Sequence, residues 1–245
     1  MDIYWLEQTE ADVPVDNQWL SPEEEICLHS MRFPKRRTDW RLGRWTAKLA
    51  LAACLDLPTD AHSLANLEIH AAPSGAPEVF LDGAPAHVAI SLSHRAGTAL
   101  CTVGSGATNF GCDLEKIEPR SNAFIADYFT ANEQVLIWHA SPQDRSLLLA
   151  LLWSAKESAL KALRVGLRLD TRSLNVSPGD VWSDAVAHDP GAWVPMQVHH
   201  AARIFEGWWR VQHDLMRTIV SDPPLQAPRH AMHAHPNGLT ASLLV

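Results

Sequence analysis

Apolar and polar residues alternate with a two-residue period in part of this chain, and that pattern predicts strands. Residues 88–94 alternate in this way, which predicts a strand that ends at His94. The β-prone runs 98–103 and 107–114 flank the turn-forming residues 104–106, and this arrangement predicts a hairpin. We therefore expect the middle of the chain to form a sheet.

Helical periodicity dominates elsewhere. The strongly apolar run 147–152 continues into 153–161, which predicts a helix buried over most of its circumference. On such a helix Glu157 lies four residues from both Trp153 and Lys161, so indole, carboxylate and ammonium share one stripe. An ordinary ion pair on a solvated face and a functional cluster both explain this stripe.

The second predicted strand ends in two carboxylates. With a two-residue period, Asp113 and Glu115 project from one face and Cys112 and Leu114 from the other. Two carboxylates on one face repel each other unless a cation lies between them. Together with Glu157 they form the kind of oxygen-rich, partial cage that Mg²⁺ accepts. A solvated strand end is the alternative.

A basic stripe is predicted on an earlier helix. Arg37, Arg41, Arg44 and Lys48 lie within roughly 60° of one another at about 100° per residue. Like charges at this spacing destabilise an isolated helix, and few acidic residues lie nearby in the sequence. An anionic ligand would remove the conflict, and a solvated basic face is the other interpretation.

Other local signals complete the predicted elements. Capping residues predict that helices start in three segments: 21–24, 130–133 and 141–144. Glu133 is accordingly either a capping-box residue or a functional one. After position 171 the chain predicts strands near 174–176, 196–198 and 208–211, followed by a Pro-rich surface segment, 223–236.

Composition narrows the class of protein. The 245 residues are 47% hydrophobic and carry a formal net charge of −8, so nucleic acid is not expected as the main partner. Mean hydropathy is −0.10, no run reaches membrane-spanning length and no targeting peptide is visible, so we expect a cytoplasmic protein without a membrane partner. The cysteines have no metal-ligand spacing and are expected as small buried side chains: Cys27, Cys54, Cys101 and Cys112.

Three motifs in order carry a family resemblance. Residues 111–115 read G-C-D-L-E, residues 129–133 read F-T-A-N-E, and residues 153–161 read W-S-A-K-E-S-A-L-K. This set resembles the signatures of the 4'-phosphopantetheinyl transferases, and the length is similar to that of the larger, surfactin-synthetase-activating type. The resemblance implies an α/β (α+β) fold of two similar subdomains related by a pseudo-twofold axis, each a small sheet packed on a long helix.

A short internal repeat agrees with two similar halves. W-T-A-K at 45–48 and W-S-A-K at 153–156 share three residues and a hydroxyl. We expect an N-terminal subdomain, 1–106, with coenzyme A contacts, and a C-terminal subdomain, 107–245, with the carboxylates and the carrier-protein contact. The internal duplication also favours a monomer. In this repeat Leu49 stands where the second copy has Glu157.

The resemblance implies a reaction and its residues. The 4'-phosphopantetheine group of coenzyme A would pass to a serine of an acyl or peptidyl carrier protein, with release of 3',5'-ADP. Asp113, Glu115 and Glu157 would hold Mg²⁺, and Glu115, Glu157 and Lys161 would be the catalytic residues. Of these, Glu157 is the expected base and Lys161 the group that stabilises or protonates the departing nucleotide.

The resemblance also implies contacts with coenzyme A. The expected contacts are Arg37, Arg41, Arg44, Lys48, Gly75, Pro77, Ser93, His94 and Lys156. One position departs from the family pattern, because Ala76 stands where the family often has lysine. A binding module that has lost turnover is therefore one alternative, and a Mg²⁺-dependent phosphohydrolase is another. The carrier, its pathway and the use of acylated coenzyme A stay open.

Overall fold

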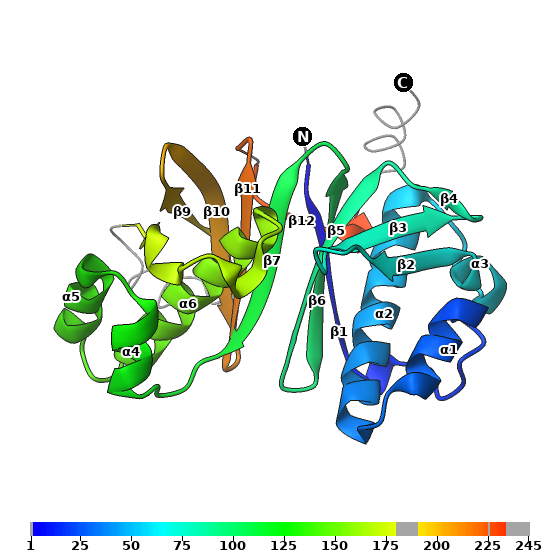
Figure 1. Cartoon of the computed structure of the whole chain (residues 1–245), viewed down its shortest axis with the longest axis horizontal. Coiled ribbons are helices and arrows are strands. Elements are labelled where there is room, and N and C mark those ends of the chain that lie inside the picture. Colours follow the sequence, from blue (N-terminus) through cyan, green and yellow to red (C-terminus); the bar gives the residue numbers. More distant parts are fainter. Residues whose placement is uncertain (1, 180–190, 225, 234–245) are drawn as a thin grey trace. The chain divides into compact units, whose positions relative to one another are not determined.

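The chain folds into two compact units. The computed structural model describes residues 2–179, 191–224 and 226–233. One unit contains the residues up to Thr108 together with the segment that starts at Pro228, and the other is Asn109–Ala227. Each unit has a sheet and a long helix, which confirms the predicted mixed α/β class (Figure 1). The pseudo-twofold axis stays a prediction.

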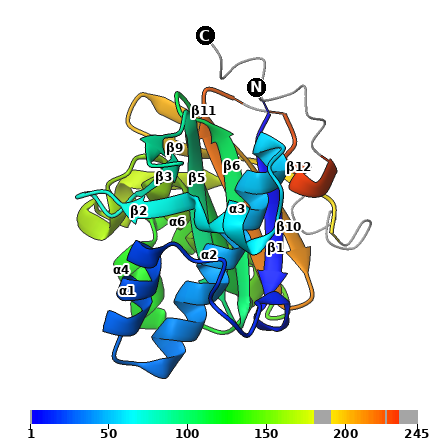
Figure 2. The same cartoon turned by 90° about the vertical axis from the view of Figure 1, so that its right-hand side faces the viewer.

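The first unit places helix α2 against a four-stranded sheet of order β12-β1-β6-β5 (Figure 2). A smaller sheet of order β2-β3-β4 also belongs to this unit. Ala47, Leu51 and Cys54 of α2 are buried in its core. Its elements are β1 (Tyr4–Thr9), α1 (Pro22–Ser30), α2 (Pro34–Leu55), α3 (Ala61–Ala65), β2 (Leu67–Ala71), β3 (Pro77–Leu81), β4 (Ala84–Pro85), β5 (Val88–Arg95), β6 (Thr98–Ser105) and β12 (Arg229–His230).

The second unit places helix α6 along strands β7 and β11 of a five-stranded antiparallel sheet (Figure 1). The strand order is β7-β11-β10-β9-β8. The strands predicted near 174–176, 196–198 and 208–211 are confirmed as parts of β8, β9 and β10. The elements are β7 (Asn109–Lys116), α4 (Asn122–Tyr128), α5 (Ala131–His139), α6 (Arg145–Ala162), β8 (Leu174–Ser177), β9 (Val194–His200), β10 (Arg203–Gln212) and β11 (Leu215–Asp222).

Two of the three predicted helix starts are confirmed. Ser21 caps α1 and Thr130 caps α5, and each forms a capping box with the glutamate three residues later. The third prediction is wrong, because α6 begins only at Arg145. Ser141 Oγ instead donates to Asp144 Oδ2 at 2.6 Å, which closes a turn before the helix.

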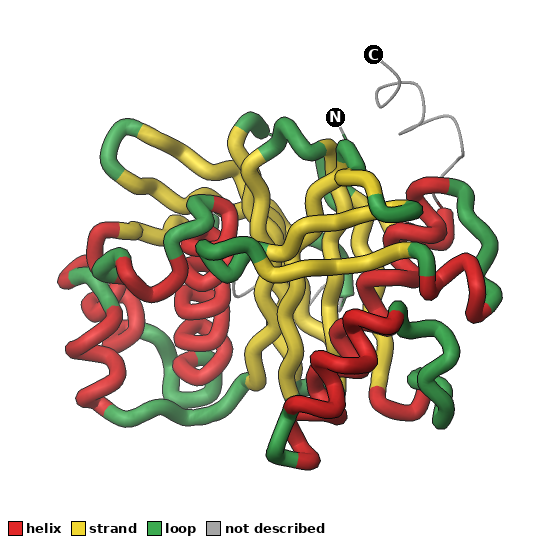
Figure 3. The backbone as a smooth tube through the Cα atoms, turned by 45° about the vertical axis from the view of Figure 1, so that its right-hand side comes forward, coloured by secondary structure: helices red, strands yellow, loops and turns green. Residues whose placement is uncertain are grey.

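The predicted hairpin is wrong. Strand β6 pairs with β1 and β5 in the first unit, whereas β7 pairs with β11 in the second. Residues 106–108 therefore connect two units rather than two paired strands. Figure 3 shows both strands as extended segments, so the extended conformation was predicted correctly and the pairing was not.

Three further expectations need correction. The Pro-rich segment 223–236 lies partly outside the described residues, but its described part includes β12, which pairs in parallel with β1, and Ala231, which is buried. The C-terminal boundary of the second unit therefore falls near 227, not at the end of the chain.

Cys27 is exposed, whereas the other three cysteines are buried as expected. No helix among the described residues is long and apolar enough to span a membrane.

Candidate active site

Strand β7 turns the predicted motif residues toward helix α6. A Cβ at Gly111 would lie only 2.0 Å from the carbonyl oxygen of Ser158, so only glycine permits this approach of the helix. Two and four residues later, Asp113 accepts a hydrogen bond from Lys161 at 2.8 Å and Glu115 accepts one from the Trp153 indole at 3.2 Å. The predicted two-residue alternation is therefore confirmed.

The stripe on α6 lies against this strand. Glu157 is half-buried between the positions of Trp153 and Lys161, one helical turn from each. Burial is the largest of the effects that together raise the pKa of Glu157 to about 7, and the charges of Asp113 and Glu115 also raise it, which Lys161 only partly opposes. Carboxylate charge therefore accumulates at this end of the sheet, as the sequence predicted.

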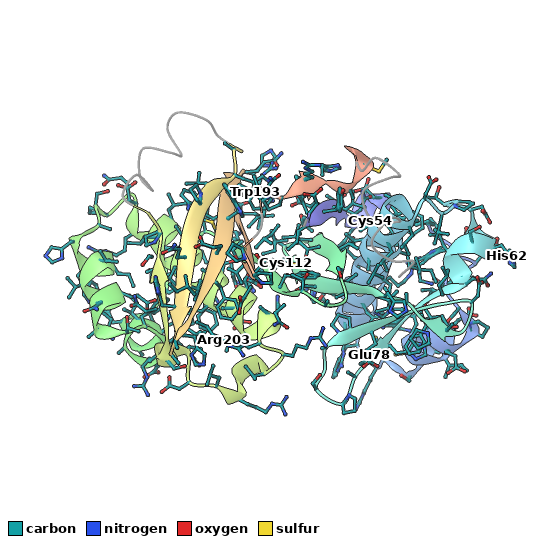
Figure 4. All side chains as sticks on the ribbon, turned by 90° about the horizontal axis from the view of Figure 1, so that it is seen from above. Cys54, His62, Glu78, Cys112, Trp193 and Arg203 are labelled. Atoms are coloured by element: carbon teal, nitrogen blue, oxygen red, sulfur yellow. The ribbon has the colours of Figure 1, made fainter. Side chains whose placement is uncertain are left out.

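Lys161 is the cation that balances part of this charge. Its ammonium donates to the backbone carbonyl of Cys112 at 2.9 Å and to Asp113 (Figure 4 labels Cys112). Burial alone would lower the pKa of Lys161, but the neighbouring anionic groups, above all Asp113, outweigh it and raise that pKa. Lys161 is therefore charged at neutral pH.

Glu115 has a different surrounding from Asp113. Its second carboxylate oxygen accepts a hydrogen bond from Arg120 at 3.1 Å, and the Arg120 guanidinium lies 5.3 Å from the ring centre of Phe124. Phe124 and Tyr128 both pack edgewise on Trp153, at centroid distances of 5.0 and 5.1 Å. The indole that contacts Glu115 is therefore held by an aromatic cluster from α4.

The chemistry of these donors suits Mg²⁺, although their present arrangement does not form a metal site. Within the described ranges, no group of three His, Cys, Asp or Glu side chains is arranged to hold a metal ion. The oxygen donors of Asp113, Glu115 and Glu157 are nevertheless the type that Mg²⁺ prefers. The raised pKa of Glu157 also indicates negative charge that a cation would offset.

Lys156, an expected coenzyme A contact, is buried inside the second unit. Its ammonium lies 2.8 Å from the Glu133 carboxylate and donates to the backbone carbonyls of Thr171 and Leu174, each at 2.8 Å. Glu133 also accepts from the backbone N–H of Val176 at 2.9 Å and closes the capping box of α5. Lys156 and Glu133 thus hold segments of the fold together, and the contact of Lys156 with coenzyme A stays a prediction that has no support from this packing.

The first unit repeats this buried pair. Lys48 ion-pairs with Glu24 and donates to the carbonyls of Trp19 and Leu64, at 3.0 and 2.8 Å. Glu24 closes the capping box of α1 and accepts from the backbone N–H of Ile69 at 3.2 Å. Lys48 has no exposed surface, so its contact with coenzyme A likewise stays a prediction without support from the packing.

The basic stripe is used mostly inside the first unit. Arg44 pairs with Glu24 at 3.4 Å and its guanidinium lies 4.8 Å from the ring centre of Trp40. Arg41 donates to the backbone carbonyls of residues 14–16. Arg37 is exposed. Internal acceptors, rather than an external anion, therefore offset most of the repulsion that the sequence predicts.

A groove of about 500 Å³ in the first unit contains His94. His94 lies at the end of β5 with 53% of its side chain exposed, and its Nε2 is 3.9 Å from Asp39 Oδ2. Apart from His94, this lining was not predicted from the sequence, although Lys35 and Arg36 directly precede Arg37 of the basic stripe. The groove is lined by Phe33, Lys35, Arg36, Asp39, Trp40 and His94.

The remaining expected contacts lie on strands and turns of the same unit. Gly75 has a φ of 88° in the turn before β3, and Pro77 is the first residue of that strand. Ser93 precedes His94 on β5. Among the expected coenzyme A contacts, only His94 lines the groove described above.

Part of the second unit is similar to a known protein family. Residues 109–204 match the 4'-phosphopantetheinyl transferase superfamily, which confirms the family resemblance read from the three motifs. Among solved structures, the chain is similar to a Helicobacter pylori holo-acyl-carrier-protein synthase in complex with coenzyme A. That similarity has 19% sequence identity and a TM-score of 0.34, and it covers 42% of this chain and 98% of the other. No curated protein matches the chain.

Proposed function

We propose that the protein transfers the 4'-phosphopantetheine group of coenzyme A to a serine of an acyl or peptidyl carrier protein. The observation that carries this proposal is the meeting of two family motifs on β7 and α6, where Lys161 contacts Asp113 and Trp153 contacts Glu115. The superfamily match over residues 109–204 supports the same reaction class.

The reaction needs a proton acceptor and a way to stabilise a leaving nucleotide. The serine oxygen forms a bond to the phosphorus next to the pantetheine, the bond from that phosphorus to the bridging oxygen breaks, and 3',5'-ADP leaves. Glu157 suits the role of acceptor for the serine proton because its pKa of about 7 lies near neutral pH. Lys161, which is charged, suits the departing phosphate.

Asp113, Glu115 and Glu157 are the residues proposed to hold Mg²⁺. The ion would supply neutralisation of the pyrophosphate charge. Cation binding would also lower the pKa of Glu157, so this carboxylate serves less well as a base when it is a direct ligand. Experiments must therefore identify the proton acceptor and the metal ligands separately.

For the nucleotide portion of coenzyme A we propose the groove around His94. Lys35 and Arg36 line it as cations and Trp40 as an aromatic surface, which suits phosphates and a base respectively. This assignment replaces Lys48 and Lys156, whose ammonium groups have internal partners.

The test is intact-mass spectrometry of apo carrier proteins incubated with this protein, coenzyme A and Mg²⁺. We expect a mass gain of one phosphopantetheine on at least one carrier, with loss of the gain in a chelator or in an Asp113→Ala variant. The carrier that reacts also identifies the pathway. Hydrolysis of coenzyme A without an acceptor would favour a phosphohydrolase, and binding of coenzyme A without transfer to any carrier would favour an inactive binding module.

A further inference from the structure

Three buried hydroxyl groups join helix α6 to strand β11. Thr218 Oγ1 lies 2.8 Å from Ser154 Oγ and 2.7 Å from Ser158 Oγ, and Ser158 Oγ also donates to the Thr218 carbonyl at 3.2 Å. None of the three residues is exposed. We call Ser154, Ser158 and Thr218 the hydroxyl clamp.

The hydroxyl clamp lies directly beside the candidate site. Ser154 follows Trp153 and Ser158 follows Glu157 in the sequence of α6. On the sheet, Thr218 is the register partner of Asp113 across the β7–β11 pair. The clamp therefore joins α6 to the strand that pairs with β7, and its two serines each follow a site residue of α6 in the sequence.

The first unit offers an internal comparison. In its copy of the W-S/T-A-K repeat, Thr46 takes the place of Ser154 and donates to the carbonyl of Leu42 within its own helix at 2.8 Å. Ala50 takes the place of Ser158 and has no hydroxyl. These two positions pack α2 on its sheet without a matching clamp. That helix also lacks the glutamate, because Leu49 stands in its place.

Buried hydroxyls are costly unless they are hydrogen-bonded, and an apolar contact would pack a helix on a sheet equally well. What hydrogen bonds add is direction, because their strength falls steeply when donor and acceptor are displaced. The clamp therefore restricts rotation of α6 about its axis and sliding along β11. Both motions would change the distance from Glu157 and Lys161 to Asp113.

We propose that Thr218 is a positioning residue, which acts through Ser154 and Ser158 to hold Glu157 and Lys161 in register with Asp113 and Glu115. This inference rests on the proposed function for its effect on turnover. On this proposal β11 contributes to the site, although none of the three sequence motifs lies on that strand.

The first test compares Thr218→Val, which keeps the shape and removes the hydroxyl, with Thr218→Ser, which keeps the hydroxyl. Thr46→Val is the matched control, because it removes a buried hydroxyl that bonds within its own helix. We expect Thr218→Val to lower kcat on the order of tenfold to 100-fold, as misplacement of reacting groups does, with KM for coenzyme A within about twofold. Thr218→Ser and Thr46→Val should keep kcat near wild type when assayed below their melting temperatures. A kcat for Thr218→Val equal to that of Thr46→Val, or no rescue by serine, would overturn the proposal.

A second test separates this inference from the proposed function. Amide hydrogen exchange over residues 153–161 should accelerate in Thr218→Val and stay near wild type in Thr46→Val. If the wild-type protein transfers nothing to any carrier, the proposed function fails while this measurement still reports on the clamp. Unchanged exchange over 153–161 in Thr218→Val would show that the hydroxyls do not hold α6.

Discussion

The ammonium of Lys161 lies 2.8 Å from Asp113, and in this position it is the cation nearest to a set of mutually repelling carboxylates. Lys161→Met removes that charge with little change in side-chain length. We expect a lower melting temperature in metal-free buffer, because Asp113 and Glu157 then lack the ammonium that opposes their repulsion, whereas Glu115 keeps its hydrogen bond from Arg120.

Millimolar Mg²⁺ should restore more of the melting temperature in Lys161→Met than it adds to the wild type, since a bound cation replaces the lost charge. Thermal unfolding with and without Mg²⁺ measures both effects. Lys116→Met is the control. Lys116 lies on β7, the strand that carries Asp113, and its side chain is 42% exposed and 3.8 Å from Asp214. An equal Mg²⁺ response in both variants would argue against the carboxylates as the metal-binding groups.

The pKa of Glu157 predicts a pH dependence of stability. Because the folded pKa is about 7 and the ordinary value is 4.5, the folded protein binds this proton more tightly than the unfolded chain. The contribution to stability is complete below pH 4.5 and is lost as pH rises through about 7. Denaturant unfolding in metal-free buffer at pH 5.5 and pH 7.5 should therefore show a larger decrease for wild type than for Glu157→Gln. Equal decreases would mean that Glu157 titrates normally in the folded protein.

The buried pairs predict a separation of folding from ligand binding. Lys156→Met leaves the buried Glu133 carboxylate without its cation, which should lower the free energy of unfolding by about 3–5 kcal/mol. Lys48→Met should act in the same direction but less strongly, because Arg44 still pairs with Glu24 at 3.4 Å. Calorimetric affinity of the folded variants for coenzyme A should stay near wild type.

A double variant provides the control. Lys156→Met combined with Glu133→Gln should recover part of the lost stability, because no uncompensated charge is then buried. A tenfold loss of coenzyme A affinity in the folded Lys156→Met protein would restore this lysine as a ligand contact.

Substitutions in the groove around His94 should weaken recognition of the phosphates of coenzyme A. Arg36→Ala and His94→Ala should each weaken binding of coenzyme A by roughly tenfold, which corresponds to about 1.4 kcal/mol for a charge-assisted hydrogen bond. Isothermal titration calorimetry with coenzyme A measures this change, and Arg203→Ala, an exposed arginine of the second unit, is the charge-matched control. If Arg36→Ala binds as tightly as Arg203→Ala, the groove does not hold the nucleotide.

Local sequence patterns predicted which side chains of the second unit share a face, for a physical reason. Gly111, Asp113 and Glu115 alternate with a period fixed by the strand, and Glu157 and Lys161 are spaced by one helical turn, so each set shares a face whatever surrounds it. What periodicity does not encode is the partner. Strand β7 pairs with β11, about a hundred residues later, and not with the neighbouring β6.

The basic stripe was misjudged for a related reason. Glu24 forms ion pairs with both Lys48 and Arg44, whereas the sequence assigns it only to a local capping box. A single carboxylate performs both tasks because it has two oxygens, and only the packing of α1 beside α2 brings the second task about. The same dual use of Glu133 resolves the choice between cap and function in favour of a structural role.

Strand β12 imposes an order on biosynthesis. Its residues Arg229 and His230 pair with the edge of β1, a strand that is synthesised before the second unit, and Ala231 enters the same core as α2. The first unit therefore begins before the second unit and is finished after it, because all of residues 109–227 must emerge before its sheet gains the outer strand. A nascent chain that stops at Ala227 leaves one side of β1 without this partner, so premature termination there would expose a strand edge open to pairing with other chains.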